Sequence, residues 1–407
     1  RAWPLLPTSS NGGGSMNMTL PLNFSGSERS SWRIDSLLLL AVLALMSLGL
    51  TMVASASFSY AEHNFNNELY FVKRHAIYIF IALAAMGVTF FTPPSVWSQY
   101  SRLWMLLATL LLIIVLIPGI GREVNGSRRW LSIAGLTLQV SELAKVATVV
   151  FMASYFANNR EGFGDNWRDW AKPLCVLMLP LILLLMEPDF GSLVVLSCTF
   201  MAMLFLTGIK LWHYFGLVFA GSSVLAIFAE AAPYRMARLS SFLDPWSDQF
   251  NSGYQLTQSL IAFGRGEWFG VGLGQSVQKM LYLPEAHTDF VFAIFAEEFG
   301  FIGVLCLLGL YVLLVWRIFS LSKKAVAQEY WYGVFVLIGF GCLISGQTLI
   351  NLGVNAGFLP TKGLTLPFVS YGGSSLMVTC AMVGMMLRIG HELHPDTQVV
   401  RRARRGR

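Results

Sequence analysis

The 407-residue chain has very little charge. Only 12% of its residues are Asp, Glu, Lys or Arg, and only 22 are acidic, whereas soluble domains carry about 25% charged residues. This shortage excludes an ordinary soluble domain. Hydrophobic residues make up 55% of the chain and the mean hydropathy is +0.60. Apolar runs near the roughly twenty residues that cross a bilayer recur along nearly the whole sequence. The composition therefore predicts an all-α, polytopic membrane protein.

The chain also lacks any cysteine pattern. Its five cysteines lie inside or at the edge of apolar runs, with neither metal-ligand spacing nor pairing in loops. Neither a disulfide framework nor a zinc site is expected, and these cysteines are interpreted as small core residues. They are Cys175, Cys198, Cys306, Cys342 and Cys380.

About ten transmembrane helices are predicted from the apolar runs. The candidate spans are residues 36–58, 76–92, 103–118, 142–158, 173–187, 191–208, 211–232, 300–319, 331–350 and 375–391. Residues 1–15 are interpreted as a vector-derived scar with a Gly/Ser linker, and Met16 as the natural start. A cytoplasmic segment (16–35) and a basic cytoplasmic tail (392–407) flank a single membrane domain at 36–391.

Lysine and arginine are more frequent in the short loops on the side of the two termini, which predicts that both termini are cytoplasmic. The outer side then holds three loops, about 119–141, 233–299 and 351–374. The second, between the seventh and eighth spans, is long for a connection inside a compact domain, and such loops are usually functional or disordered. Its aromatic residues argue against disorder, so we expect it to fold back against the membrane surface.

The end of this outer loop, LPEAHTDFVFAIFAEEFG (283–300), concentrates four carboxylates. Residues from Asp289 onward have the pattern of a buried helix, which puts Asp289 at or near the helix start. One interpretation is that Asp289 only caps the helix. The alternative is a general base, because desolvation and the nearby Glu285 oppose its ionisation while the helix dipole favours it. His287 lies two residues away. Glu297 and Glu298, two turns further on, are expected to be structural partners of buried polar groups.

The first outer loop and the following span hold a second group of charges. Arg122, Arg128 and Arg129 suit a phosphate, although a solvated charge cluster explains them as well. Glu142 and Lys145, at i and i+3 on one face of the fourth span, are either a functional pair or an internal clamp, and the clamp is favoured.

The third outer loop has mixed polar residues at a depth where irregular backbone must be buried in protein or line a cavity. Asn355, Thr361, Lys362 and Ser370 are its candidate cavity residues. Two other motifs are given less weight. The segment GRGEWFGVGLGQS (264–276) lacks the features of a nucleotide loop. Turn chemistry accounts for Pro188 and Asp189 in EPDFG (187–191), although its Glu187 and Asp189 could face the same cavity.

The motifs NGSRRWL, LQVSELAK, EPDFGS, YLPEAHTDFVFAIFAEE and GFLPTKGLTLPFVSYGGSS, taken in this order, resemble the SEDS family of bacterial membrane proteins. The resemblance covers residues 30–391 and is strongest to the division branch rather than the elongation branch. It implies a ten-helix fold and a peptidoglycan glycosyltransferase that polymerises lipid II at the outer face of the inner membrane. The family's essential aspartate falls on Asp289. Arg122, Glu142 and Lys145 fall on cavity positions, and Lys362 is a weaker match. One departure is Val140, where the family commonly has proline.

The resemblance also implies a mechanism and partners. Asp289 would act as general base in an inverting transfer between lipid II and a polyprenyl-pyrophosphate-linked glycan. A divalent cation, Mg or Mn, could assist, with Asp289 and Glu285 as candidate ligands; no organic cofactor and no nucleic acid are expected. The implied protein partners are a class B penicillin-binding protein transpeptidase (FtsI-like) and other division proteins (FtsQLB- and FtsN-like) at the division septum. A lipid II flippase and a non-catalytic division scaffold remain the alternatives.

Overall fold

The structure is a computed structural model, and it describes residues 33–394 except 125–126, 134–135, 161–162, 164–165, 231–241 and 362. The predicted scar, the start at Met16, most of the segment 16–35, the basic tail from residue 395 and Lys362 lie outside the described residues. The chain divides into two units, residues 1–32 and 33–407, and the description below concerns the second.

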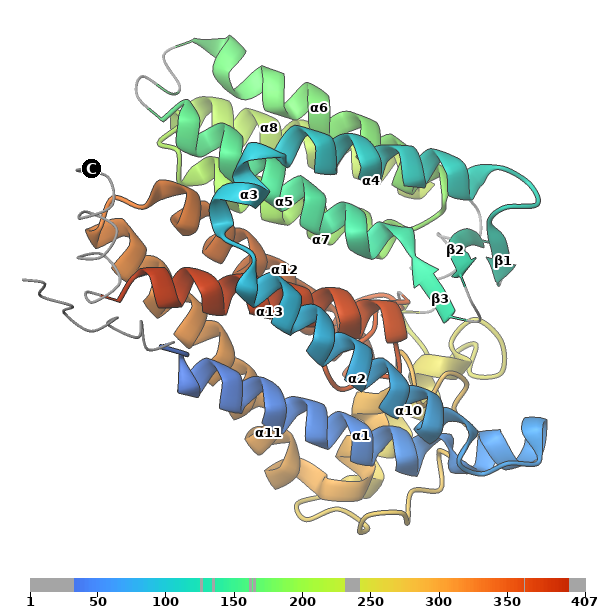
Figure 1. Ribbon diagram of the computed structural model, residues 1–407. Coiled ribbons are helices and arrows are strands. Elements are labelled where there is room, and N and C mark those ends of the chain that lie inside the picture. The colour runs from blue at the N-terminus through green and yellow to red at the C-terminus, as the bar shows by residue number, and fades with distance from the viewer. Residues whose placement is uncertain are drawn as a thin grey trace, which may run out of the picture. The chain divides into compact units, whose positions relative to one another are not determined.

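Each predicted span coincides with a helix (Figure 1). The helices are α1 (Ser36–Phe65), α2 (Tyr70–Phe91), α3 (Pro94–Gln99), α4 (Ser101–Leu116), α5 (Val140–Asn158), α6 (Trp167–Met186), α7 (Phe190–Phe205), α8 (Leu211–Glu230), α10 (Tyr254–Gly266), α11 (Val291–Ala327), α12 (Trp331–Asn355) and α13 (Gly373–Glu392). Among the described residues, seven of these (α1, α2, α5, α6, α11, α12 and α13) are long and apolar enough to cross a membrane, and α4 and α7 are shorter apolar helices. The predicted helical membrane fold is confirmed.

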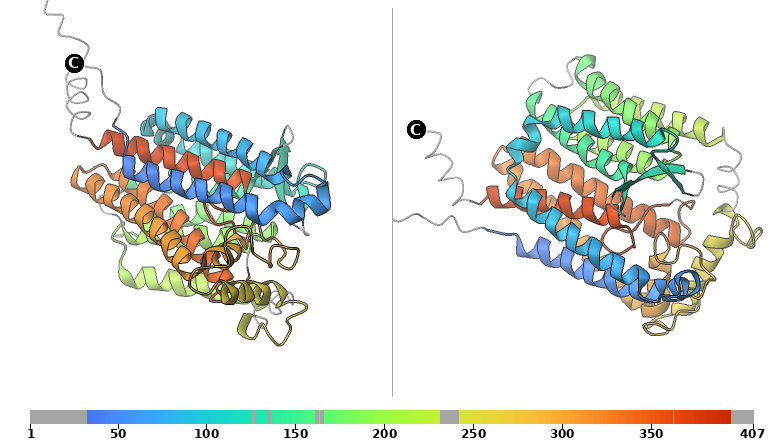
Figure 2. Two further views of the ribbon diagram at one scale, coloured as in Figure 1. Left: turned by 90° about the horizontal axis from the view of Figure 1, so that it is seen from below. Right: turned by 45° about the vertical axis from the view of Figure 1, so that its right-hand side comes forward.

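Helices distant in sequence form the interior of the bundle. α13 lies along α2, and α12 contacts both α5 and α11 (Figures 1 and 2). Small residues allow the closest approach: a Cβ atom added at Gly384 of α13 would lie 2.2 Å from the Met86 carbonyl oxygen of α2. Without a hydrophobic driving force in lipid, such close van der Waals contact is what holds membrane helices together.

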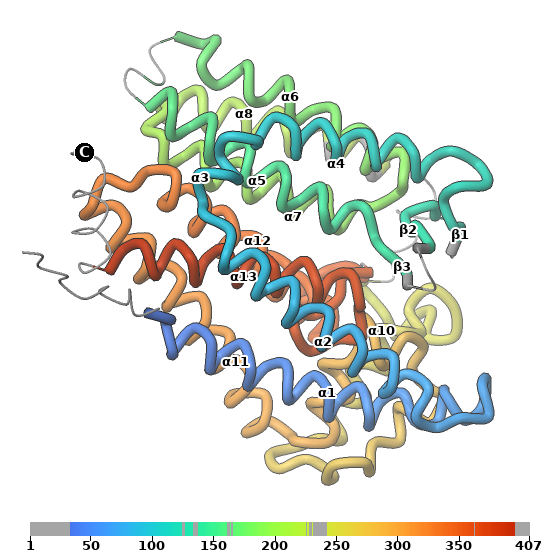
Figure 3. The backbone as a smooth tube through the Cα atoms, viewed as in Figure 1, coloured from blue at the N-terminus to red at the C-terminus, as the bar shows by residue number. Residues whose placement is uncertain are grey.

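α11 is two helices joined at a sharp break. Gly300 has φ +65° and ψ −168°, which interrupts the helix between the buried segment that starts at Val291 and the membrane-spanning part (Figure 3). The sequence predicted this division, with a buried helix up to Gly300 and a separate span after it. The residues beside the break hydrogen-bond to the outer loop instead: Val271 donates to the Glu297 carbonyl at 3.0 Å and Gly272 to that of Glu298 at 3.0 Å.

The long outer loop is folded where it is described. It contains α10, which contacts α11 and α12. The acids at the end of the first part of α11 contact residues of this loop and of α1. Glu298 accepts hydrogen bonds from Lys279 (2.8 Å) and Ser55 (2.6 Å), and Glu297 pairs with Arg265 (3.1 Å). Both glutamates are almost completely buried. Their predicted role as structural partners is confirmed.

The all-helical expectation missed a small antiparallel sheet in the first outer loop. Its strands, in spatial order, are β1 (Arg122–Val124), β2 (Ser127–Ile133) and β3 (Leu136–Gln139). The sheet lies at the same end of the helical bundle as α10 (Figures 1 and 2). β3 continues without a loop into α5, which begins at Val140. The helix therefore starts at the position of the family's proline although this chain has valine there.

Candidate active site

Asp289 lies two residues before α11, at the end of a turn. Its backbone carbonyl accepts hydrogen bonds from the side-chain amides of Asn351 and Asn355, both at 2.9 Å, from the last turns of α12. The N-cap position of α11 is Phe290, and no side chain caps this helix. The predicted position near the helix start is therefore correct, whereas a simple capping role for the Asp289 side chain is not what the structure shows.

The surroundings of the Asp289 carboxylate differ from those of the buried glutamates Glu297 and Glu298. The Asp289 carboxylate is partly exposed, and no hydrogen bond or ion pair reaches it from the residues that the structure describes. The third outer loop approaches it closely, because a Cβ atom added at Gly363 would lie 3.1 Å from its Oδ2. Burial, and then the charge of Glu285, raise the pKa of Asp289 to about 7, against the opposing effect of Arg129. A group with this pKa can accept a proton near neutral pH.

The other two candidates in this turn have different surroundings. Glu285 is exposed and accepts a hydrogen bond from the Thr288 hydroxyl at 2.6 Å. His287 is buried against the rings of Tyr60 and Phe71 (centroids at 5.3 and 4.6 Å), and its carbonyl accepts from the Tyr371 N–H at 2.9 Å. Burial lowers the pKa of His287, with Glu285 opposing the shift. His287 therefore anchors the turn as a neutral aromatic residue.

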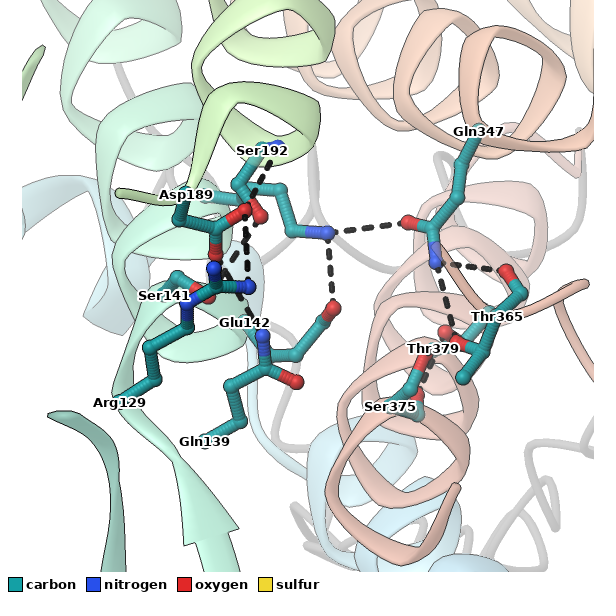
Figure 4. Close-up of polar contacts among 11 residues, drawn as sticks. Arg129, Gln139, Ser141, Glu142, Asp189, Ser192, Gln347, Thr365, Ser375 and Thr379 are labelled. Carbon is teal, nitrogen blue, oxygen red and sulfur yellow. Dashed lines mark hydrogen bonds and ion pairs between the residues drawn. The ribbon is translucent and has the colours of Figure 1, made fainter. Parts of the chain in front are cut away.

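Of the three arginines, Arg129 is the one whose charge acts on Asp289. Arg129 donates from Nε to the Glu187 carbonyl (3.0 Å) and from Nη2 to the Pro188 carbonyl (2.8 Å), and its Nη1 lies 3.9 Å from Asp189 (Figure 4). These contacts hold its guanidinium in a fixed orientation.

The other two arginines of the sheet differ from Arg129 in their surroundings. Arg128 pairs with the exposed Glu123 at 3.0 Å. Arg122 is exposed on β1. For Arg128, the interpretation as a solvated charge is therefore the one that the geometry favours.

The turn between α6 and α7 contributes a group that the sequence analysis gave little weight. Asp189 accepts from the Ser192 N–H at 3.1 Å and caps α7, as turn chemistry predicts. Glu187 is completely buried, and neither of its carboxyl oxygens has a hydrogen-bond partner among the described residues. Burial, and then Asp189, raise the pKa of Glu187 to about 8, while Arg129 opposes the shift. In the sequence, the signal for this buried group was the occurrence of two acids, Glu187 and Asp189, at the end of the apolar span 173–187.

A second group of charged and polar residues forms a buried network across the bundle. Lys145 donates to Glu142 and to the Gln347 side-chain oxygen, both at 2.9 Å. Gln347 in turn donates to the Thr365 carbonyl at 3.0 Å (Figure 4). Glu142 and Lys145 are both buried. The geometry favours the internal clamp that joins α5 to α12 and to the third outer loop.

The candidates in the third outer loop divide as well. Ser370 is buried, and its hydroxyl accepts from the Leu366 N–H at 2.8 Å, so it closes a turn. Asn355 is also fully buried, and its contacts are to the protein. Thr361 is half-buried.

The described residues contain no group of three or more His, Cys, Asp or Glu side chains that could hold a metal ion. Asp289 and Glu285 together supply at most two carboxylates. Mg²⁺ is commonly held by one or two carboxylates together with substrate phosphates. The residues present therefore fit a cation only as part of a complex with a phosphorylated substrate.

Comparisons with known proteins agree with this architecture. The family of FtsW, RodA and SpoVE, described as "Cell cycle protein", matches residues 35–394. A probable peptidoglycan glycosyltransferase FtsW from Saccharophagus degradans is 47% identical over 94% of this chain and 98% of its own. A relative with the same description from Legionella pneumophila is 49% identical over 88% and 91% of the two chains.

Two solved structures share the fold. One, described as "Structural coordination of polymerization and crosslinking by a peptidoglycan synthase complex", has a TM-score of 0.74 and 29% identity, and the match covers 89% of this chain and 99% of that one. The rod shape determining protein RodA of Thermus thermophilus has a TM-score of 0.65 and 28% identity, over 89% and 98% of the two chains. The resemblance predicted from the sequence motifs is confirmed: the chain belongs to the SEDS family, the family of FtsW, RodA and SpoVE.

Proposed function

We propose that this chain is a peptidoglycan glycosyltransferase that polymerises lipid II during cell division, with Asp289 as the general base. The main support is the state of the Asp289 carboxylate. It is partly exposed, it has no ion-pair partner among the described residues, and burial raises its pKa to about 7. A structural carboxylate would be paired, as Glu298 is with Lys279. The names of the FtsW relatives support the reaction class.

In the proposed reaction, the acceptor sugar's 4-hydroxyl lies against Asp289. Its proton moves to the carboxylate while its oxygen attacks the anomeric carbon of the donor sugar. The bond from that carbon to the polyprenyl pyrophosphate breaks on the opposite face, so the configuration inverts. General-base catalysis of this kind typically contributes about 10²–10⁴-fold to the rate.

Arg129 is the group best placed to stabilise the negative charge on the leaving pyrophosphate. Its charge acts on Asp289, so it lies near the reacting groups, and two backbone carbonyls fix its orientation. Preorganised donors of this kind stabilise charge that develops in the transition state. A divalent cation, when bound with the substrate, would supply further positive charge to the pyrophosphate.

The proposed setting is the bacterial inner membrane at the division septum, with both termini cytoplasmic and the Asp289 site on the outer face. The solved complex that joins polymerisation and crosslinking supports a transpeptidase partner. By the resemblance, this partner is a class B penicillin-binding protein, and other division proteins of the FtsQLB and FtsN kinds would regulate the pair.

The test uses purified protein, with and without its cognate transpeptidase, incubated with lipid II, and the glycan products are sized on a gel. The expected result is polymer from the wild-type chain and none from Asp289→Ala, with lipid II binding retained. Polymer formation by Asp289→Ala at the wild-type rate would overturn the assignment of the base. Absence of polymer with every partner combination would favour the lipid II flippase or the non-catalytic scaffold.

A further inference from the structure

Two asparagines near the C-terminal end of α12 both contact the backbone carbonyl oxygen of Asp289. Asn351 and Asn355 lie at i and i+4, on one face of the helix, and each donates from its amide nitrogen to the Asp289 carbonyl oxygen at 2.9 Å. Their exposed fractions are 1% and 0%. Neither side chain therefore reaches a substrate, although the sequence analysis made Asn355 a cavity residue.

The contacts fix which way each amide points. The Asn355 side-chain oxygen accepts from the Ala293 N–H at 3.2 Å, and a backbone N–H can only donate. The nitrogen of Asn355 must then be the atom at Asp289. Asn351 Nδ2 contacts two carbonyl oxygens, those of Asp289 and of Leu364 (2.6 Å), so it must be the donor in both.

Each asparagine joins a different part of the site to Asp289. Asn351 joins the turn that carries Asp289 to Leu364, which follows Gly363, the residue beside the Asp289 carboxylate. Asn355 joins Asp289 to the first turn of α11, and its own carbonyl accepts from Ser259 of α10 at 2.7 Å. The two amides thus connect the segments on either side of the carboxylate to one rigid helix.

We propose that Asn351 and Asn355 are positioning residues that hold Asp289 between the start of α11 and the third outer loop. This inference rests on the proposed function of Asp289. Two donors on its carbonyl fix the Asp289 backbone, and Gly363 lies against the carboxylate, where an added Cβ atom would be 3.1 Å from Oδ2. Catalytic groups held in this way lose activity steeply when they move, by about 100-fold for a displacement of 1 Å.

A positioning role and a merely structural role predict different effects on kcat and on its pH dependence. Loss of an asparagine lets Asp289 move towards water, where desolvation no longer opposes its ionisation. The rate then falls because the base is misplaced, and the pH at which the base becomes active falls as well. Binding of lipid II should change little, because both asparagines are buried and therefore do not contact the substrate.

The experiment compares Asn351→Ala and Asn355→Ala with Thr348→Ala in the lipid II polymerisation assay with the cognate transpeptidase. Thr348 lies on the same helix, is 4% exposed, and its hydroxyl has no hydrogen-bond partner among the described residues. The expected result for each asparagine variant is a 10- to 100-fold lower kcat, a KM within about 3-fold of wild type, and an acid limb of the pH–rate profile shifted to lower pH. Thr348→Ala should keep the wild-type profile.

A further variant separates positioning from folding. Asn355→Asp keeps an oxygen that can accept from the Ala293 N–H but loses the amide nitrogen that donates to the carbonyls of Asp289 and Asn351. Its thermal transition is measured beside kcat, and a lower kcat in protein that keeps the wild-type transition supports the positioning role. Asparagine variants with a wild-type kcat and pH profile would overturn the positioning role, provided that Asp289→Asn is inactive in the same assay. Activity in Asp289→Asn would instead overturn the proposed base, and the positioning role with it.

Discussion

The carboxylates at the two ends of the segment 285–298 have opposite surroundings. At the far end, both glutamates are buried and paired. Glu297 pairs with Arg265 and accepts from the Ser276 hydroxyl. Glu298 pairs with Lys279 and accepts from the Ser55 hydroxyl. At the near end, the protein holds Asp289 by its backbone carbonyl and leaves the carboxylate without such partners among the described residues.

The difference shows how the surroundings of a carboxylate decide whether it is suited to a structural role or to proton transfer. A carboxylate that is paired with a cation and accepts from a hydroxyl contributes to the fold. A carboxylate that is desolvated and unpaired costs stability, and the cost appears as a raised pKa. Such a cost is typical of functional sites, and it distinguishes Asp289 from its neighbours better than its sequence position does.

The largest expected effect is on stability. Glu298→Ala would leave the Lys279 ammonium buried without its partner, and breaking a buried pair in this way costs about 3–5 kcal/mol. Asp289→Asn should behave in the opposite way. Because the pKa of Asp289 is raised in the folded protein from 3.8 to about 7, its ionisation removes stability as pH rises through this window.

Thermal unfolding in detergent at pH 8 and pH 5 measures both effects. At pH 8, Glu298→Ala should unfold well below wild type and Asp289→Asn above it, and the advantage of Asp289→Asn should shrink towards pH 5. If Asp289→Asn is as destabilised as Glu298→Ala, then Asp289 also contributes to the stability of the fold, and the difference drawn between it and Glu298 is wrong.

The second effect concerns Arg129, whose charge acts on Asp289 while that of Arg128 is engaged by Glu123. Removal of one preorganised transition-state donor typically lowers kcat about 10²–10³-fold. Arg129→Ala should show a loss of this size in the rate of lipid II polymerisation. Arg129→Lys should recover little, because lysine lacks the planar fork that the carbonyls of the 187–188 turn orient.

Arg128→Ala is the matched control, since it removes the neighbouring arginine of the same strand. Its rate should stay within a few-fold of wild type. Equal losses in Arg128→Ala and Arg129→Ala would mean that the sheet contributes only general positive charge.

The smallest effect is on the pH–rate profile. The general base must be ionised, so kcat should rise about tenfold per pH unit below a pKa of about 7 and level off above it. Glu285→Gln removes the second cause of the raised pKa but not the burial, which is the first cause, so the acid limb should move part of the way to lower pH. The control is Glu123→Gln, which removes an exposed acid elsewhere in the outer loops and should leave the acid limb of the pH–rate profile unchanged. An unchanged acid limb in Glu285→Gln would show that burial alone raises the pKa of Asp289.

Long apolar runs and local helical patterns were enough to predict the spans, the buried helix that precedes the span at 300–319, and the place of Asp289. These features depend on residues close together in the chain. The role of Glu297 and Glu298 also followed, because a buried acid in a helix requires a partner.

What the sequence did not predict depends on pairing between distant or irregular segments. Arg128 and Arg129 were treated as equivalent, but consecutive residues of a strand point to opposite faces, and the strand itself was missed. Asn355 was assigned to a cavity because its contact with Asp289, 66 residues away, cannot be seen from spacing. The importance of Glu187 depends on how completely α6 and α7 bury it.

The break at Gly300 also bears on which parts of the outer loop can vary. Four backbone hydrogen bonds join residues 267–272 to residues 297–302, including Phe301 to Glu267 at 2.9 Å and Ile302 to Trp268 at 3.1 Å. This stretch of loop therefore replaces hydrogen bonds that an unbroken helix would make within itself. Loops usually tolerate insertions because their backbone is free, but here an inserted residue would shift every one of these pairs. The length of this segment is as constrained as that of a helix, although it has the sequence of a loop.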